Sequence, residues 1–252
     1  MKNIKTIVIS IDGSSRRNKI QSYLEEKQIP FKSFKYKDFI FTINVNNKFP
    51  DSFKGRGWVN IGEIGCIISH YCLWKELTIS NDVNSFLILE DDAKPLFTGI
   101  DLDNFYTSQI LKDVDIIACQ CTKPNFNYRT MFNMLTNSIK LVELENEKAE
   151  LCEGTAGYII TKSGAKKLTE IVEKCGLIFT VDNFIFRCSQ EANLKWYITT
   201  KQIQVDLDRE LAGTSSIHSG HAKDNFIVQD KIKSKIIKEQ MCNGIFFIYN
   251  NV

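Results

Sequence analysis

The feature that most constrains the fold is an uninterrupted apolar run, Phe86 to Leu89, that stops at three consecutive carboxylates, Glu90, Asp91 and Asp92. A strand without polar alternation has to be covered on both faces, which is typical of a sheet packed between helices. Neighbouring carboxylates repel one another, and each is costly to hold beside an apolar interior. The sequence therefore predicts a core strand whose end meets either water or a positive group.

The segments around this run alternate between strand and helix patterns. A β-branched strand is expected over 5–11, followed by a turn and a helix over 15–29. Apolar side chains at helical spacing predict a second helix over 60–80, and a third is expected over 165–175, ended by Gly176. Further strands are expected over 113–121, 156–161, 196–200 and 203–207. This order predicts an α/β fold with a mostly parallel sheet flanked by helices.

Length and charge narrow the class of protein. The chain has 252 residues, 43% of them hydrophobic, and a formal net charge of +2. This suits one domain over 1–252 with 207–252 as a C-terminal tail, and the mild charge does not indicate nucleic-acid binding. No apolar run reaches the roughly 18 residues that a transmembrane helix needs. The start of the chain resembles a first strand more than a signal peptide, so we expect a cytoplasmic protein with reduced cysteines.

Cysteine spacing does not complete a metal site. Cys119 and Cys121 lie on one face of an expected strand, but no second pair or histidine cluster accompanies them. We expect buried, reduced thiols here.

The carboxylate triplet is a candidate cation site. Ligands of α/β sheets bind beyond the carboxyl ends of the strands, which is where the triplet is expected. In an extended segment Glu90 and Asp92 would share a face while Asp91 points away. Two carboxylates on one side suit Mg²⁺ or Mn²⁺, whereas the alternative is a solvated turn with a capping aspartate.

Three segments together resemble a known family. They are GEIGCIISHYCLWKEL (62–77), FLILEDDAKPLF (86–97) and GTAGYIITKSGAKKL (154–168). The chain from Lys5 to about Phe186 resembles glycosyltransferase family 25, which includes bacterial lipooligosaccharide galactosyltransferases and collagen galactosyltransferases. The first strand is followed by serines and paired arginines, but the Asn-Leu usual in that family is missing, and residues 35–58 and the tail beyond Asp206 match nothing in it.

The resemblance implies a GT-A fold and inverting transfer of a sugar from a nucleotide-sugar donor, with UDP-galactose first by analogy. It also implies that Glu90, Asp91 and Asp92 correspond to the metal-binding acidic element of the family. Asp92 would then bind Mn²⁺ or Mg²⁺, and Glu90 or Asp91 would lie at the metal, the ribose or the sugar. The acceptor implied is a lipooligosaccharide, a capsular glycan or another lipid-linked glycan at the inner face of the cytoplasmic membrane. A basic segment over 230–252 could touch that membrane, although its simpler interpretation is a solvated face.

Arginines and glycines supply the other donor-binding candidates. Arg16 and Arg17 follow the first strand, where nucleotides bind in many α/β folds, and guanidinium groups suit phosphate. Exposed helix arginines are the simpler interpretation. Gly154 and Gly157 would let the backbone approach a sugar, although glycines in a turn need no ligand to explain them.

An inverting transfer needs a base that takes the acceptor's proton. Asp182 is the first candidate because apolar residues surround it in the sequence, with helix capping as its alternative role. Glu153 is the reserve. His218 is a candidate third metal ligand, while His70 is expected to be a buried core or supporting histidine rather than a ligand.

Two other functions are alternatives to sugar transfer. A two-component receiver domain also binds Mg²⁺ with paired acidic residues, but its pair follows the first strand, and here the acidic cluster comes much later. A catalytically silent relative that binds a glycan or a partner protein is the remaining alternative.

Overall fold

The computed structural model describes residues 4–10, 14–35, 41–43, 61–107, 113–120, 141–144, 154–175, 181–182, 184–185, 193–199, 203–208, 210 and 246–248. The chain begins with strand β1 (Ile4–Ser10), helix α1 (Ser15–Glu26) and strand β2 (Phe31–Lys35). Helix α2 (Ile61–Ile79) leads into β4 (Ser85–Glu90), the strand that carries the carboxylates. The remaining elements are β3 (Phe41–Ile43), β5 (Ala93–Pro95), α3 (Gly99–Thr107), β6 (Ile116–Ala118), β7 (Leu141–Leu144), β8 (Gly157–Thr161), α5 (Lys162–Cys175), β9 (Trp196–Thr199), β10 (Val205–Leu207) and β11 (Phe246–Ile248).

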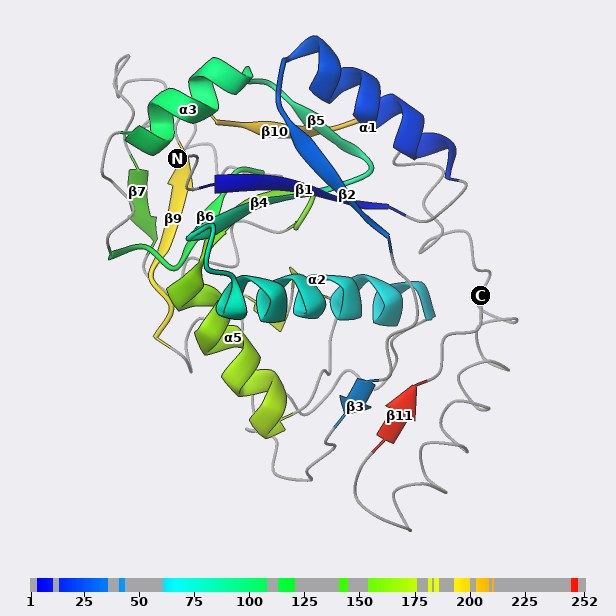
Figure 1. The fold of residues 1–252 in the computed structure, drawn as a ribbon, viewed down its shortest axis with the longest axis vertical. Helices are drawn as coiled ribbons and strands as arrows, with labels where there is room; N and C mark the ends of the chain where they lie inside the picture. The colour runs from blue at the N-terminus through cyan, green and yellow to red at the C-terminus, as the bar shows by residue number, and fades with distance from the viewer. Residues whose placement is uncertain are drawn as a thin grey trace.

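A seven-stranded sheet with the order β2-β1-β4-β8-β6-β9-β7 forms the centre of the described fold (Figure 1). Strand β1 pairs in parallel with both β2 and β4, and β6 pairs in parallel with β9. Strand β8 is antiparallel to β4 and β6, and β7 is antiparallel to β9. Since β2, β1, β4, β6 and β9 therefore run in one direction, the sheet is mostly parallel, as predicted.

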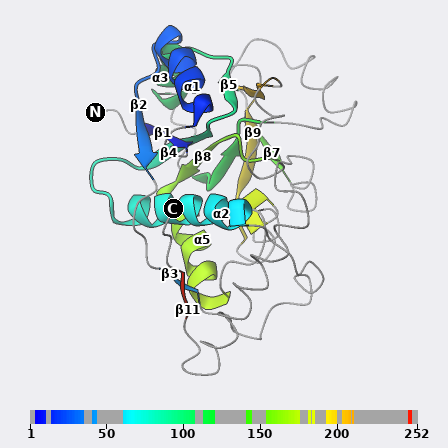
Figure 2. The ribbon, with the colours of Figure 1, turned by 90° about the vertical axis from the view of Figure 1, so that its right-hand side faces the viewer.

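The helices cover the two faces of this sheet. Helices α1 and α3 lie on one face, and α2 and α5 lie on the other (Figures 1 and 2). Alternation along β4 explains the division: Leu87 and Leu89 pack in the cluster under α1 and α3, whereas Phe86 and Ile88 pack in the cluster under α2 and α5. All four side chains are buried, so β4 is the two-sided core strand that its sequence predicts.

The C-terminal part of the described chain returns to the carboxylates. Strand β10 pairs antiparallel with β5, which follows the triplet directly. The Asp208 amide then donates to the Asp92 carbonyl at 2.9 Å, and the Asp208 carboxylate accepts from the Tyr23 hydroxyl of α1 at 2.6 Å. These contacts fix the turn that holds Asp91 and Asp92 against the start of α1.

Most expected elements are present, with shifted ends. The strands expected over 113–121 and 203–207 are shorter, at Ile116–Ala118 and Val205–Leu207, while α2 and α5 begin within three residues of their expected starts. Helix α3 and strand β7 were not predicted. Gly176, Cys121 and most of 230–252 lie outside the described residues, so the expected helix stop, the cysteine pair and the basic tail stay predictions.

Gly164 provides a test of the packing between α5 and the sheet. A Cβ atom at this position would lie 2.4 Å from the Asp115 carbonyl oxygen, which is backbone and cannot rotate away. We expect Gly164→Ala to lower the free energy of unfolding by about 1–3 kcal/mol because of overpacking. Urea denaturation measures this, with Lys166→Ala as the control on the same helix, where the 73% exposed side chain predicts a change within about 0.5 kcal/mol. An equal effect of both variants would contradict the packing.

Candidate active site

The carboxylates lie where two neighbouring parallel strands end. In the β1–β4 ladder, Ile9 is paired with Glu90, so the last residue of β1, Ser10, lies beside the start of the acidic turn. Helix α1 begins a few residues later, with Ser14 as its N-cap. This is the edge of an α/β sheet at which ligands bind, because the carboxyl ends of parallel strands and the amino end of a helix meet there.

Asp91 is held by residues from β1 and α1. Its Oδ2 accepts from the hydroxyls of Ser10 at 2.9 Å and Ser14 at 3.2 Å, and its Oδ1 accepts from the Arg16 guanidinium at 3.3 Å. The Ser14 hydroxyl also accepts from the Arg16 amide, so the helix cap and the carboxylate share one network. Arg16 is therefore a positive group of the kind that the sequence predicts at the end of the strand.

Asp92 contacts the same arginine but is less well satisfied. Its Oδ2 accepts from Arg16 at 3.4 Å, while its Oδ1 is buried and has no hydrogen-bond partner. Burial and the charge of Glu90 raise the pKa of Asp92 to about 6, although Arg16 acts in the opposite direction. The Arg16 guanidinium is thus shared between two carboxylates, and one buried oxygen of Asp92 is left without a hydrogen bond.

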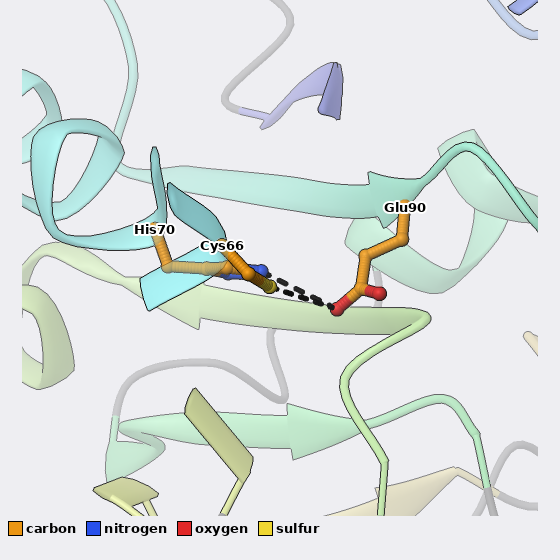
Figure 3. A group of neighbouring side chains, drawn as sticks. All are labelled: Cys66, His70 and Glu90. Carbon is orange, nitrogen blue, oxygen red and sulfur yellow. Dashed lines mark hydrogen bonds and ion pairs between the residues drawn. The ribbon is translucent and has the colours of Figure 1, made fainter. Parts of the chain in front are cut away.

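Glu90 points to the opposite side of the sheet. It continues the alternation of Phe86 and Ile88 and so faces α2 (Figure 3). Its Oε1 lies 3.4 Å from His70 Nε2 and 4.0 Å from Cys66 Sγ, both on α2, and accepts from the Thr155 hydroxyl at 2.5 Å. Burial acts to raise the pKa of this carboxyl, but the interactions with His70, Thr155 and Arg16 together lower it.

His70 is held from behind by two aromatic residues. Its Nδ1 lies 2.7 Å from the Tyr158 hydroxyl, which also accepts from the Trp74 indole at 3.0 Å. The rings of His70 and Tyr158 stack with their centroids 5.5 Å apart, and both residues are buried. The hydrogen-bonded side chains of Trp74 and Tyr158 therefore fix the His70 imidazole beside Glu90.

The sequence predicts that Glu90 and Asp92 share one face and that Asp91 points away, and only the second part of this prediction agrees with the structure. Glu90 and Asp91 do lie on opposite sides, but Asp92 does not return to the side of Glu90. Residues 91 and 92 form a turn, so the alternation of an extended strand ends at Glu90, and both aspartates contact Arg16.

The two predicted glycines have packing roles. Gly154 has a φ of +115°, a conformation that favours glycine, and a Cβ there would meet the Gln120 amide group at 2.7 Å. At Gly157 a Cβ would lie 2.6 Å from the Val205 side chain, where β8 and β10 approach each other closely. Neither glycine needs a ligand to explain it, and their contact with a sugar stays a prediction.

Of the other predicted site residues, two lie in the described part of the chain and two do not. Arg17 is partly buried in the first turn of α1, and its contact with a phosphate stays a prediction. Asp182 is partly buried in a short helical segment whose neighbours Val181 and Phe184 pack under α2 and α5. Glu153 and His218 lie outside the described residues.

Sequence reasoning missed the partners of the carboxylates. Ser10 and Thr155 are ordinary residues in the sequence, and only the pairing of β4 with β1 and β8 brings them to the triplet. Cys66 and His70 did carry a signal, because a cysteine and a histidine four residues apart share one helix face. The sequence did not indicate that this face of α2 packs against the end of β4, where Glu90 lies.

Comparisons with known proteins agree with the motifs. Residues 3–185 match the family described as glycosyltransferase family 25 (LPS biosynthesis protein). A Haemophilus influenzae protein with a provisional glycosyltransferase name is 28% identical over 188 residues, covering 71% of this chain and 61% of that protein. Human procollagen galactosyltransferase 2 is 27% identical over 132 residues, covering 49% of this chain and 19% of that protein.

The remaining comparisons concern a solved structure and the lengths of the relatives. Among solved structures, an active-site mutant of LgtC is 12% identical with a TM-score of 0.36, covering 77% of this chain and 71% of that one. The chain spans at most 61% of the length of the two curated relatives given above.

The raised pKa of Asp92 predicts a pH dependence of stability without metal. The folded state holds this proton more tightly than the unfolded chain, so ionisation destabilises the fold as pH rises from 3.8 through about 6. In EDTA we expect Asp92→Asn to be more stable than the wild type by about 1–3 kcal/mol near pH 7.5, with little difference near pH 4. Urea denaturation across this range measures it. The exposed Asp82→Asn is the control, and a stability difference between wild type and Asp92→Asn that does not vary with pH would contradict the prediction.

Proposed function

Because the chain belongs to glycosyltransferase family 25, we propose that it transfers a sugar from a nucleotide-sugar donor to a glycan acceptor with inversion at the sugar carbon. The observation that carries the proposal is the meeting of Asp91, Asp92 and Arg16 at the shared ends of β1, β4 and α1. Acidic and basic groups lie together there, as a cation and a diphosphate require.

The acidic turn fits a divalent cation. The Asp92 Oδ1 atom is buried and has no hydrogen-bond partner, and burial together with the charge of Glu90 raises the pKa of Asp92. Carboxylate oxygens are the ligands that Mg²⁺ and Mn²⁺ prefer. When bound, such a cation would stabilise the negative charge that grows on the departing diphosphate. Asp92 would be its principal ligand, with His218 as a further proposed ligand. Glu90, which the sequence predicts as a ligand of the same cation, instead faces α2 on the other side of the sheet.

Arg16 supports donor binding in the same proposal. Its guanidinium already reaches both aspartates from the first turn of α1, with 11% of the side chain exposed. A cation bound at the aspartates would neutralise part of their negative charge. The planar guanidinium of Arg16 could then donate hydrogen bonds to phosphate oxygens. Arg17, beside it, is the second proposed phosphate ligand, and Asp91 is proposed to lie near the ribose or the sugar.

The finer assignments concern the sugar, the nucleotide and the acceptor. Galactose as the sugar is supported by the names of the procollagen galactosyltransferases among the relatives, and UDP as the nucleotide is proposed by family analogy. The acceptor is proposed to be a lipooligosaccharide, a capsular glycan or another lipid-linked glycan at the inner face of the cytoplasmic membrane, by family analogy. No helix in the described part of the chain is both long and apolar enough to cross a membrane.

A silent binding protein is the second candidate function. One observation favours it: Arg16 already pairs with Asp91 and Asp92, so the turn keeps its shape without a metal. A binding protein of this kind would recognise a glycan without transferring a sugar.

A donor screen separates these functions. We expect one UDP-sugar with Mn²⁺ to raise the melting temperature of the full chain and to be hydrolysed slowly, with both effects lost in EDTA. Asp92→Asn should stay folded but lose the metal-dependent shift, while the exposed Asp82→Asn should keep it. If no UDP-, GDP- or CMP-sugar changes the melting temperature in either condition, the transferase proposal is wrong and the binding protein takes its place.

The proposed base gives a second test. Asp182→Asn should leave the donor-induced thermal shift unchanged and lower turnover by about 10²-fold or more, because the acceptor hydroxyl loses its proton acceptor. Steady-state turnover measures this, with the exposed Glu170→Gln as the control. Unchanged turnover would exclude Asp182 and leave Glu153 as the candidate.

A further inference from the structure

We propose that Cys66, His70 and Glu90 form a Zn²⁺ site on the α2 side of the sheet, distinct from the acidic turn of Asp91 and Asp92. Among the described residues, these three bring one sulfur, one nitrogen and one oxygen atom within 4.8 Å of one another (Figure 3). The proposal does not depend on the transfer reaction, since it rests on the side chains between α2 and the end of β4.

The separations match a tetrahedral zinc ion. Zinc lies about 2.3 Å from sulfur and about 2.0–2.2 Å from nitrogen and oxygen, so tetrahedral ligands are roughly 3.4 Å apart for nitrogen and oxygen and roughly 3.6 Å apart for sulfur and oxygen. The corresponding distances here are 3.4 Å from His70 Nε2 to Glu90 Oε1 and 4.0 Å from Cys66 Sγ to Glu90 Oε1. A small rotation of the Cys66 side chain closes the difference.

The imidazole is aimed into this cluster. His70 is completely buried, yet its Nε2 makes no hydrogen bond of acceptable geometry, although Glu90 Oε1 is only 3.4 Å away. Its other nitrogen, Nδ1, is engaged by the Tyr158 hydroxyl. The tautomer decides what Nε2 can do. When Nδ1–H donates to Tyr158, the Nε2 lone pair is available to a cation shared with the Glu90 oxygen, whereas a proton on Nε2 would be donated to Glu90. Zinc-binding histidines are supported in this way, through a hydrogen bond from the ring nitrogen that does not bind the metal.

The donor set selects the metal. A thiolate and an imidazole favour Zn²⁺ over Mg²⁺ or Mn²⁺, which prefer oxygen ligands. The Asp91–Asp92 turn, in contrast, offers only carboxylate oxygens and is contacted by Arg16 of α1. The two sides of the triplet are thus suited to different cations, and zinc would tie the end of β4 to α2.

Metal content tests the proposal. The full chain, produced with added zinc and freed of loose metal by gel filtration, should hold about one zinc ion per chain. Cys66→Ala should weaken zinc binding at least tenfold, whereas Cys72→Ala, on the same helix but outside the cluster, should keep it. Replacement of zinc by Co²⁺ should give a thiolate-to-cobalt absorption band in the wild type and in Cys72→Ala but not in Cys66→Ala. Tyr158→Phe should weaken binding about 10–100-fold, the scale for losing a supporting hydrogen bond.

Any of three results would overturn the site. One is a wild-type chain that takes up neither zinc nor cobalt under these conditions. Another is Cys66→Ala with the same zinc content and cobalt spectrum as the wild type, and the third is the tautomer result given below. Circular dichroism establishes that each variant is folded, and nitrogen NMR of the wild type adds an independent reading. An Nε2–H tautomer of His70 that persists when zinc is added would mean that His70 simply donates to Glu90, without a metal.

Discussion

The structure depends on how three like charges are compensated at the end of a buried strand. Glu90, Asp91 and Asp92 follow four buried apolar residues, so none of them can rely on full hydration. The fold divides the cost between its two faces. Glu90 turns to the polar groups of α2, and the aspartates turn to Arg16 and the serines of β1 and α1.

This division also explains why the elements are placed as they are. The parallel pairing of β1 with β4 puts Ser10 beside the acidic turn, and the Ser14 cap starts α1 so that Arg16 reaches it. On the other face, β8 brings Thr155 and Tyr158 to Glu90 and His70. Compensation remains incomplete at Asp92, whose pKa is raised. Carboxylates that lack enough positive charge around them destabilise the folded protein when no cation is bound, and a bound cation stabilises it. This is a common property of binding sites.

The sequence predicted the parts of this arrangement that depend on local pattern. The apolar run identified β4, the helical spacing identified α2, and the abrupt carboxylates indicated the edge of the sheet as a candidate site. Arg16 was predicted as a phosphate ligand, and its contacts with Asp91 and Asp92 were not predicted. Contacts between distant segments could not be predicted: the turn that rotates Asp92 toward Arg16 is fixed by Asp208, which lies 116 residues later. The pairing of Cys66 with His70 was not predicted, although the two lie four residues apart on one helix, and their contact with Glu90 became apparent only from the packing of α2 on β4.

The central claim is that the acidic turn, through Asp92, holds a divalent cation together with a nucleotide diphosphate. The most direct measurement is electron paramagnetic resonance of free Mn²⁺ during a titration of the full chain with UDP present. The account predicts that the wild type removes about one Mn²⁺ per chain from solution and that Asp92→Asn, though folded, removes almost none. Equal Mn²⁺ uptake by the two proteins would contradict it.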